Sequence, residues 1–194
     1  MSVTDRIYSV VRSVMLVLII SAAQVLTLSV GQATPSASAV EVVKKAEAVA
    51  KREKKNVFVY FHASWCPWCK RMERLLADPV YGPKLQASYV IAEIDVRERG
   101  ERQKDENAGW DKLMANLRGA AEQDVPYYAV LTPKGKKLGD SYRVVDVRIP
   151  SNAGYPQTEP EIKGFLDLLA RTAPAFTSAD LKNLGGYFRT GTNR

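Results

Sequence analysis

Two cysteines, Cys66 and Cys69, are the only ones in the 194-residue sequence, and two residues separate them. An apolar run precedes them and a helix-forming run follows, so Cys66 is expected to begin a helix. At a helix N-terminus, free main-chain N–H groups and the helix dipole stabilise a thiolate. The second thiol, one turn further on, can close a disulfide or resolve a mixed one. The spacing therefore predicts a centre for thiol–disulfide exchange.

Other uses of a Cys-x-x-Cys pair fit the sequence less well. A structural disulfide here would close a very short loop, which gives little stabilisation compared with a long loop. A zinc site needs a tetrahedral ligand set, and His62, the only histidine, is the one further strong ligand nearby. A soft ion such as Cu(I) could bind both thiolates, with Met72 or His62 as a further ligand. This metal-binding module is the alternative function. Otherwise no metal and no cofactor beyond the Cys66–Cys69 pair is predicted.

The charge pattern argues against nucleic acid as a partner. The chain has 28 Lys and Arg against 21 Asp and Glu, a net charge of +7, and the excess is spread along the sequence. The densest charged runs, 51–55 and 97–106, interleave acids with bases and lack aromatic residues that could stack on nucleotide bases. They are interpreted as solvent-exposed helix faces, with a preference for acidic partners as the other interpretation.

Residues 1–39 have the form of a secretory signal peptide. A basic start precedes an apolar stretch over 14–30, and the small residues Ala37-Ser38-Ala39 follow. Cleavage is expected after Ala39, although Ser38 and Glu41 also have the spacing of a capping box for the next helix. The apolar stretch is also long enough to stay as a membrane anchor. Both outcomes predict an exported protein, periplasmic or secreted, whose membrane contact is limited to this segment.

Hydrophobic periodicity predicts an α/β pattern around the cysteines. Alternation of strands and helices implies that the first two strands are parallel. The segment 97–123 is longer than a minimal crossover; its first half is expected to be a surface loop or extra helical turns that could gate the site. In chain order the predicted elements are a helix at 40–55, a strand at 57–61, a helix at 66–76, a strand at 89–96, a helix at 110–117, strands at 124–131 and 138–149, a loop at 151–157, a helix that begins at the capping box of 158–161, and a short helix at 178–184 that ends at Gly185-Gly186.

With this order of elements, the sequence Trp65-Cys66-Pro67-Trp68-Cys69-Lys70 and the downstream Val125-Pro126 resemble the thioredoxin superfamily. The similarity is strongest to exported bacterial thioredoxin-like proteins, including the thioredoxin-like domain of periplasmic thiol:disulfide interchange proteins. It covers residues 40–172, so residues 173–194 are expected to form a helical appendage. The implied fold is α/β, a central mixed sheet flanked by helices, with an extended crossover segment and an extra C-terminal helix.

The resemblance implies an enzyme, a thiol–disulfide oxidoreductase that acts on protein thiols and disulfides. Cys66 would be the exposed nucleophile and Cys69 the buried resolving thiol. Pro126 would follow a cis peptide bond beside the sulfurs, and the main chain of Val125 would pair with a substrate segment. Reduction or isomerisation is expected rather than oxidation, with a membrane or periplasmic redox partner to recharge the pair. The other predicted substrate contacts are Trp65, Pro67 and Trp68, and core packing is the alternative interpretation of Trp65.

Two positions depart from ordinary thioredoxins. Those proteins have a buried aspartate at the position of Tyr60, which is thought to help deprotonate the resolving thiol. The proton of Cys69 must therefore go to water or to another acid, or it is not transferred at all. His62 replaces a tryptophan and is interpreted either as a group that stabilises the Cys66 thiolate or as a side chain that reaches solvent or a main-chain partner. Tyr60 and His62 are thus candidate pKa-tuning residues.

Overall fold

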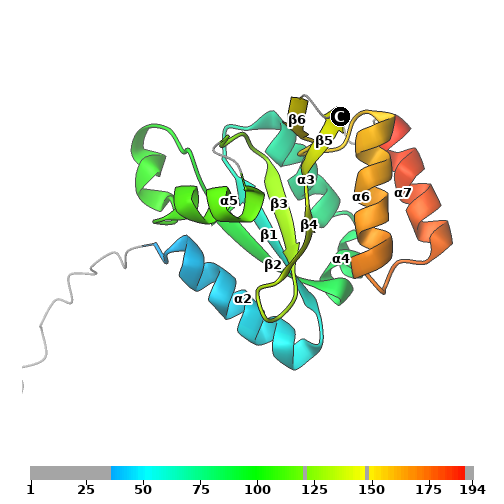
Figure 1. The fold of residues 1–194 in the computed structure, drawn as a ribbon, viewed down its shortest axis with the longest axis horizontal. Coiled ribbons are helices and arrows are strands. Elements are labelled where there is room, and N and C mark those ends of the chain that lie inside the picture. Colours follow the sequence, from blue (N-terminus) through cyan, green and yellow to red (C-terminus); the bar gives the residue numbers. More distant parts are fainter. Residues whose placement is uncertain (1–35, 120–121, 147–148, 191–194) are drawn as a thin grey trace, which may run out of the picture. The chain divides into compact units, whose positions relative to one another are not determined.

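The computed structural model describes residues 36–119, 122–146 and 149–190 (Figure 1). The predicted signal peptide or anchor therefore lies almost entirely outside the described residues. Within those three ranges, no helix is both long enough and apolar enough to cross a membrane.

A four-stranded mixed sheet forms the centre of the domain, with strand order β2-β1-β3-β4. β1 (Asn56–His62) pairs in parallel with β2 (Tyr89–Asp95) and antiparallel with β3 (Tyr127–Leu131). β4 (Lys137–Asp140) pairs antiparallel with β3. The five middle residues of β1 and all five of β3 are buried, as a sheet covered on both faces requires. The predicted mixed α/β sheet is confirmed.

Helices cover both faces of this sheet (Figure 1). Because side chains alternate along a strand, Val57, Val59 and Phe61 of β1 pack in one core cluster, and Phe58 and Tyr60 pack in the other. The first cluster takes in residues from α2 and α5, and the second takes in residues from the other four helices. The helices are α2 (Ala39–Glu53), α3 (Pro67–Leu76), α4 (Gly82–Ser88), α5 (Trp110–Arg118), α6 (Glu159–Thr172) and α7 (Ser178–Thr190).

The first half of the long segment between β2 and β3 lies mostly on the surface, although Glu98 and Asn107 are buried. It contains a 3-10 helix, η1 (Gly100–Asp105), none of whose residues is buried. Asn107 then anchors the segment, because its side chain accepts a hydrogen bond from the main-chain N–H of Asp95 at 2.7 Å and donates one to Ala37 O at 2.7 Å. This agrees with the expected surface loop with extra helical turns.

The single strand predicted over 138–149 is wrong. β4 ends at Asp140, and β5 (Tyr142–Asp146) pairs instead with β6 (Ile149–Asn152) in a separate two-stranded sheet, so the predicted loop at 151–157 begins later. Ser141 stands at the break: its main-chain N–H donates to Tyr128 O at 2.9 Å, and its hydroxyl donates to the Asn152 side chain at 2.7 Å. A buried serine that joins two sheets interrupts pairing without interrupting the alternating sequence pattern.

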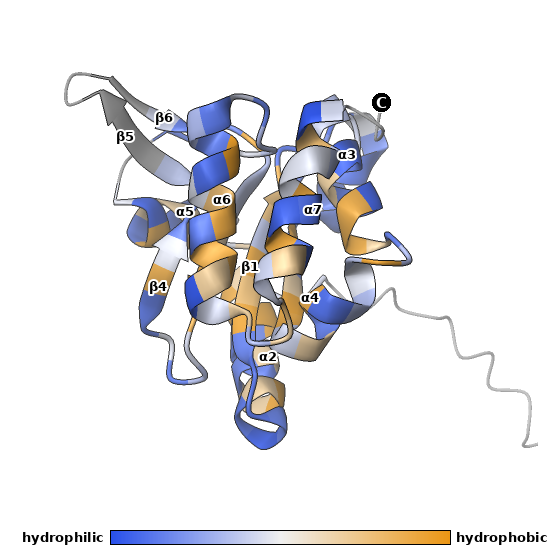
Figure 2. Ribbon diagram, turned by 90° about the vertical axis from the view of Figure 1, so that its right-hand side faces the viewer, coloured by the Kyte–Doolittle hydropathy of each residue, from blue (hydrophilic) through white to orange (hydrophobic). Residues whose placement is uncertain are grey.

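The prediction that the last helix ends at Gly185-Gly186 is also wrong, because α7 continues to Thr190. Gly185 is buried, and a Cβ atom there would lie 3.2 Å from the Leu166 side chain of α6. The glycine therefore permits close approach of the two helices, which lie side by side in Figure 2. This packing, with Phe165 and Phe188 rings 5.6 Å apart, outweighs the helix-propensity cost of glycine, about 1 kcal/mol per residue.

Candidate active site

The Cys-x-x-Cys motif lies where β1 passes into α3. Cys66 is the N-cap residue of α3, with an extended backbone (φ −84°, ψ 115°). Its sulfur accepts a hydrogen bond from the main-chain N–H of Cys69 at 3.2 Å. Pro67 occupies the first turn, where its missing N–H leaves no helical hydrogen bond unmade. The Cys66 sulfur is therefore positioned at the helix N-terminus, where a negative charge is stabilised.

The two cysteines are free thiols with opposite acidities. A hydrogen bond from the Cys69 thiol, aided by the main-chain N–H groups of Cys69 and Trp68, lowers the pKa of Cys66 to about 6. The same hydrogen bond and burial raise the pKa of Cys69. At neutral pH, Cys66 is thus the thiolate and Cys69 holds the proton. Cys66 is less accessible than expected of an exposed nucleophile, since only 3% of the residue is exposed, against 0% for Cys69.

The loop at Val125-Pro126 lies against the Cys66 sulfur, which is 3.5 Å from Val125 O. The peptide bond between these two residues is cis, as the resemblance implies. β3 begins immediately afterwards at Tyr127, and the side-chain amide of Asn152 in β6 donates to Pro126 O at 2.8 Å. The central sheet and the β5–β6 hairpin thus both hold this loop beside the cysteines.

Trp68 forms a partly exposed wall next to the motif. Its residue is 37% exposed, and its ring stacks near that of Tyr155, with centroids 6.4 Å apart. A pocket of about 160 Å³ lies between Trp68 and residues 124–126 and 152–155. The predicted substrate contacts Trp68, Val125 and Pro126 therefore share one concave surface, to which the β5–β6 hairpin contributes the opposite wall.

Trp65 is held by contacts with the segment that follows β2. Its indole N–H donates to Arg97 O at 2.6 Å, and the Arg99 guanidinium lies 3.8 Å from the ring centroid. The ring also packs, partly buried, against the core cluster that contains both cysteines. The structure therefore places Trp65 both in the core and at the rim of the site.

Glu98 is a positioning residue that sequence reasoning missed. It is buried, with 3% exposure, and accepts hydrogen bonds from the main-chain N–H of Ser64 at 2.7 Å and from the Ser64 hydroxyl at 2.5 Å. Burial alone would raise the pKa of Glu98, but the hydrogen bonds from Ser64 and the charge of Arg102 hold that pKa below its usual range. Nothing in the charged run 97–106 distinguishes this acid from its exposed neighbours.

Tyr60 and His62 have parallel rings with centroids 4.9 Å apart. The Tyr60 hydroxyl donates to Cys69 O at 3.0 Å, and burial raises the pKa of Tyr60. Tyr60 is thus a neutral hydrogen-bond donor to the motif and not a proton acceptor. The two ring nitrogens of His62 face carboxylates, Nδ1 at 3.5 Å from Glu73 and Nε2 at 3.5 Å from Asp95.

The metal-binding alternative depends on a further ligand for the two sulfurs. In the three described ranges, no three His, Cys, Asp or Glu side chains are grouped so that they could hold a metal ion. The arrangement does provide what thiol chemistry needs: a thiolate at a helix N-terminus and a second thiol one turn away.

Fold and motif together define a thioredoxin-like domain. Residues 39–133 match the family model described as thioredoxin-like, and this part of the chain belongs to that family. Residues 39–133 therefore form a domain of the thioredoxin superfamily. A search of curated protein sequences gave no match.

Three solved structures illustrate the similarity. A disulphide isomerase from Xylella fastidiosa is 25% identical, with 54% of this chain and 73% of that chain covered and a TM-score of 0.44. A thioredoxin from Thermus thermophilus is 29% identical, with coverages of 50% and 68% and a TM-score of 0.36. The C-terminal domain of DsbD from Neisseria meningitidis is 20% identical, with coverages of 54% and 83% and a TM-score of 0.37. Because these TM-scores are low, the assignment of the domain depends on the family match and not on the solved structures.

Proposed function

We propose that this protein is an exported thiol–disulfide oxidoreductase that exchanges disulfides with protein substrates. One observation carries the proposal. The Cys66 sulfur lies at the N-terminus of α3 with a pKa lowered to about 6, and the Cys69 thiol lies beside it with a raised pKa. This is the division of labour between an attacking thiolate and a resolving thiol.

The reaction proceeds in two exchange steps. The Cys66 thiolate attacks one sulfur of a substrate disulfide, which forms a mixed disulfide and releases the first substrate thiolate. Cys69 then loses its proton and attacks the Cys66 sulfur. The second substrate thiolate leaves, and the Cys66–Cys69 disulfide forms. The substrate gains two electrons, and the protein dithiol is oxidised.

Substrate contacts come from the surface around the sulfurs. An extended substrate segment would lie along the main chain of Val125, with an apolar side chain against Trp68. Trp65, Pro67 and Pro126 would line the same surface. The proposed substrates are exported proteins that carry thiols or disulfides, and the basic and apolar N-terminal segment supports export.

Reduction or isomerisation is the proposed direction. The pKa of Cys66, about 6, lies nearer to that of thioredoxin, about 7, than to that of the oxidant DsbA, about 3.5. A thiolate that is less strongly stabilised makes the disulfide form less oxidising. A membrane or periplasmic electron donor would then return the pair to the dithiol.

Insulin reduction with a small dithiol as electron source tests the proposal. Cys66→Ser should abolish the activity, and Cys69→Ser should accumulate mixed disulfides that a reductant releases. Full activity of the Cys66 variant would contradict the proposed function. Stoichiometric Cu(I) binding by the reduced protein, without exchange activity, would favour the metal-binding module instead.

A redox titration of the Cys66–Cys69 couple against glutathione tests the direction. A potential between about −270 and about −180 mV, the range from thioredoxin to protein disulfide isomerase, agrees with reduction or isomerisation. A potential near −120 mV, roughly that of DsbA, would assign the protein to disulfide formation.

A further inference from the structure

Three buried side-chain atoms close to the cysteines have no hydrogen-bond partner. They are both ring nitrogens of His62 and Oε1 of Glu73. Buried polar atoms are hydrogen-bonded in the large majority of cases, so a cluster of such atoms needs a physical explanation. A change of protonation would provide this explanation, because a titratable group can form hydrogen bonds to its neighbours in one protonation state that it cannot form in the other.

The geometry places His62 between two carboxylates on different elements. His62 ends β1 and is paired in register with Asp95 on β2. Its Nε2 lies 3.5 Å from Asp95 Oδ1, and its Nδ1 lies 3.5 Å from Glu73 Oε1 on α3. Both distances exceed those of a good hydrogen bond, so a small movement closes either contact.

Titratable groups face His62 from each element packed around it. Tyr60 of β1 stacks on its ring, Glu73 approaches from α3, and Asp95 approaches from β2. The charge of His62 also acts on Glu98 in the loop after β2. Lys70 forms an ion pair with the other carboxylate oxygen of Glu73 at 2.8 Å. An imidazolium can donate from both nitrogens, whereas a neutral imidazole can donate from only one.

Glu73 connects this cluster to the cysteines. It lies one helical turn after Cys69, so the two side chains are neighbours on the same face of α3. Its negative charge acts on Cys66 and on Tyr60, raising the pKa of each. Cys69 must lose a proton to resolve a mixed disulfide, and Tyr60, a neutral phenol that already donates to Cys69 O, is not a base.

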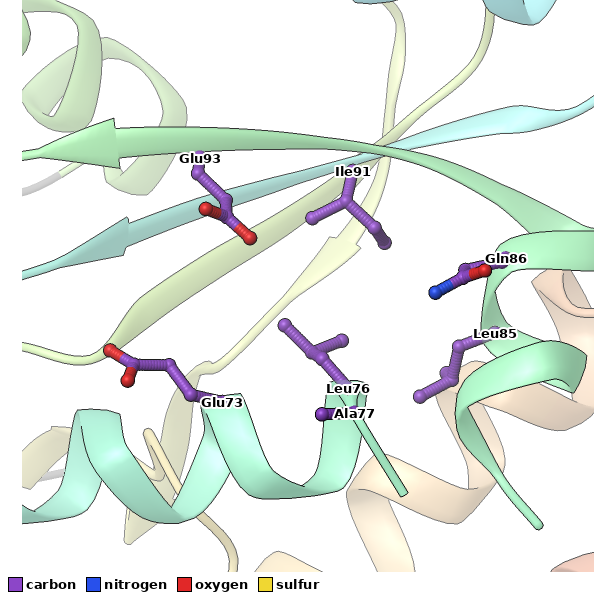
Figure 3. Close-up of a pocket in the computed structure, with 7 residues that line it drawn as sticks. All are labelled: Glu73, Leu76, Ala77, Leu85, Gln86, Ile91 and Glu93. Atoms are coloured by element: carbon purple, nitrogen blue, oxygen red, sulfur yellow. The ribbon is translucent and has the colours of Figure 1, made fainter. Parts of the chain in front are cut away.

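Water can reach the outer side of Glu73. The side chain lines a pocket of about 430 Å³ between α3, α4 and β2, which has room for several water molecules. Figure 3 shows Glu73 and Glu93 at the same end of this pocket, with Leu76 and Ile91 further along it. A proton held by Glu73 therefore has a route to solvent that avoids the substrate surface.

We infer that Glu73 and His62 accept the proton that Cys69 loses when it resolves the mixed disulfide, and that Asp95 orients the imidazole. The inference rests on the proposed exchange function. The Cys69 S–H proton moves to Glu73 Oε1 and on to His62 Nδ1. The sulfur electron pair forms the bond to Cys66, the bond between Cys66 and the substrate breaks, and the substrate leaves as a thiolate. The proton then passes to solvent through the pocket or to that thiolate.

Stopped-flow reaction with a chromogenic aryl disulfide separates the two steps. One aryl thiolate is released when Cys66 attacks and a second when Cys69 resolves the mixed disulfide. Glu73→Gln and His62→Gln should slow the second release, on the order of a hundredfold, which is within the range for general acid–base catalysis. The first release should change little at a pH where Cys66 is ionised. Glu93→Gln, which changes an exposed acid of β2 that lines the same pocket, is the matched control.

The outcomes of this experiment distinguish a failure of the inference from a failure of the proposed exchange function. A wild-type protein that gives no second release contradicts the proposed exchange function. A normal second release in both variants, with an active wild type, overturns the proton-accepting role alone. If Glu93→Gln slows the second release as much as Glu73→Gln does, general charge loss in the pocket explains the effect and the inference is overturned.

Discussion

The carboxylate of Glu98 accepts two hydrogen bonds from Ser64, one from its main-chain N–H at 2.7 Å and one from its hydroxyl at 2.5 Å. Ser64 belongs to the turn between β1 and Cys66, whereas Glu98 follows β2. The loop after β2 thus holds the turn that places Cys66 at the start of α3. This contact makes the position of the nucleophile depend on a buried charge.

Glu98→Gln should therefore lower the free energy of unfolding at neutral pH by about 1–3 kcal/mol, the cost of weakening charge-assisted hydrogen bonds to a buried group. The pKa of Glu98 in the folded state lies below its usual range. Its contribution is present above the usual carboxyl pKa and is lost as pH falls through the folded-state value. Urea denaturation at neutral and acidic pH should show the difference between wild type and variant shrinking in acid.

Glu101→Gln is the matched control, because Glu101 lies in η1, which has no buried residue. It should leave the urea midpoint nearly unchanged at both pH values. A Glu98 variant as stable as this control at neutral pH would show that the two Ser64 contacts do not contribute to stability.

The reactivity of Cys66 should follow a pKa of about 6. Its rate of alkylation by iodoacetamide should rise through that pH and then level off, whereas an ordinary cysteine becomes reactive near about pH 8.5. Cys69→Ala removes the hydrogen bond that contributes most to the lowered pKa, so the midpoint should move upward in that variant. A midpoint near that of an ordinary cysteine in the wild type, or no change in the variant, would contradict this account of Cys66.

The local sequence predicted most of what positions Cys66. The apolar run of β1, the helix-forming run of α3 and the proline at its first turn are all short-range signals, and each became the expected element. The cis bond at Val125-Pro126 followed from the family resemblance and not from any local pattern. Sequence patterns failed where a contact between distant segments decides the structure.

Three residues illustrate that failure. Ser141 ends β4 because it bonds Tyr128 and Asn152, yet its neighbours continue an alternating pattern. Glu98 belongs to a charged run but is buried against Ser64. Glu73 has the spacing of an outward-facing helix residue, and only the packing of α3 on β1 brings its Oε1 atom toward His62.

The hydrogen bonds at the start of α2 bear on the cleavage that the sequence predicts after Ala39. Ser38 and Glu41 form a complete capping box, and Ala39 N donates to Ala108 O at 3.0 Å. Ser38→Ala should cost about 1 kcal/mol of unfolding free energy. A chain that begins at Val40 should lose more, because it also lacks the contact of Ala37 with Asn107. Urea denaturation of chains beginning at Ser36 and at Val40 measures the difference.

Intact-mass analysis of the protein isolated from cells then shows whether the chain is cleaved and, if so, on which side of Ser38. Equal stability of the two chains would mean that the capping box contributes nothing to the fold. In that case cleavage after Ala39 would be without structural consequence.

The two adjacent glycines of α7 should respond oppositely to substitution. No heavy atom lies within 4 Å of a Cβ built on Gly186, so Gly186→Ala should raise the free energy of unfolding by about 0.5–1 kcal/mol through the better helix propensity of alanine. At Gly185 a Cβ already lies 3.2 Å from Leu166, so Gly185→Val should push α7 away from α6 and destabilise the domain. Thermal and urea denaturation of the two variants measure both effects. Equal effects at the two positions would contradict the close packing of α7 on α6.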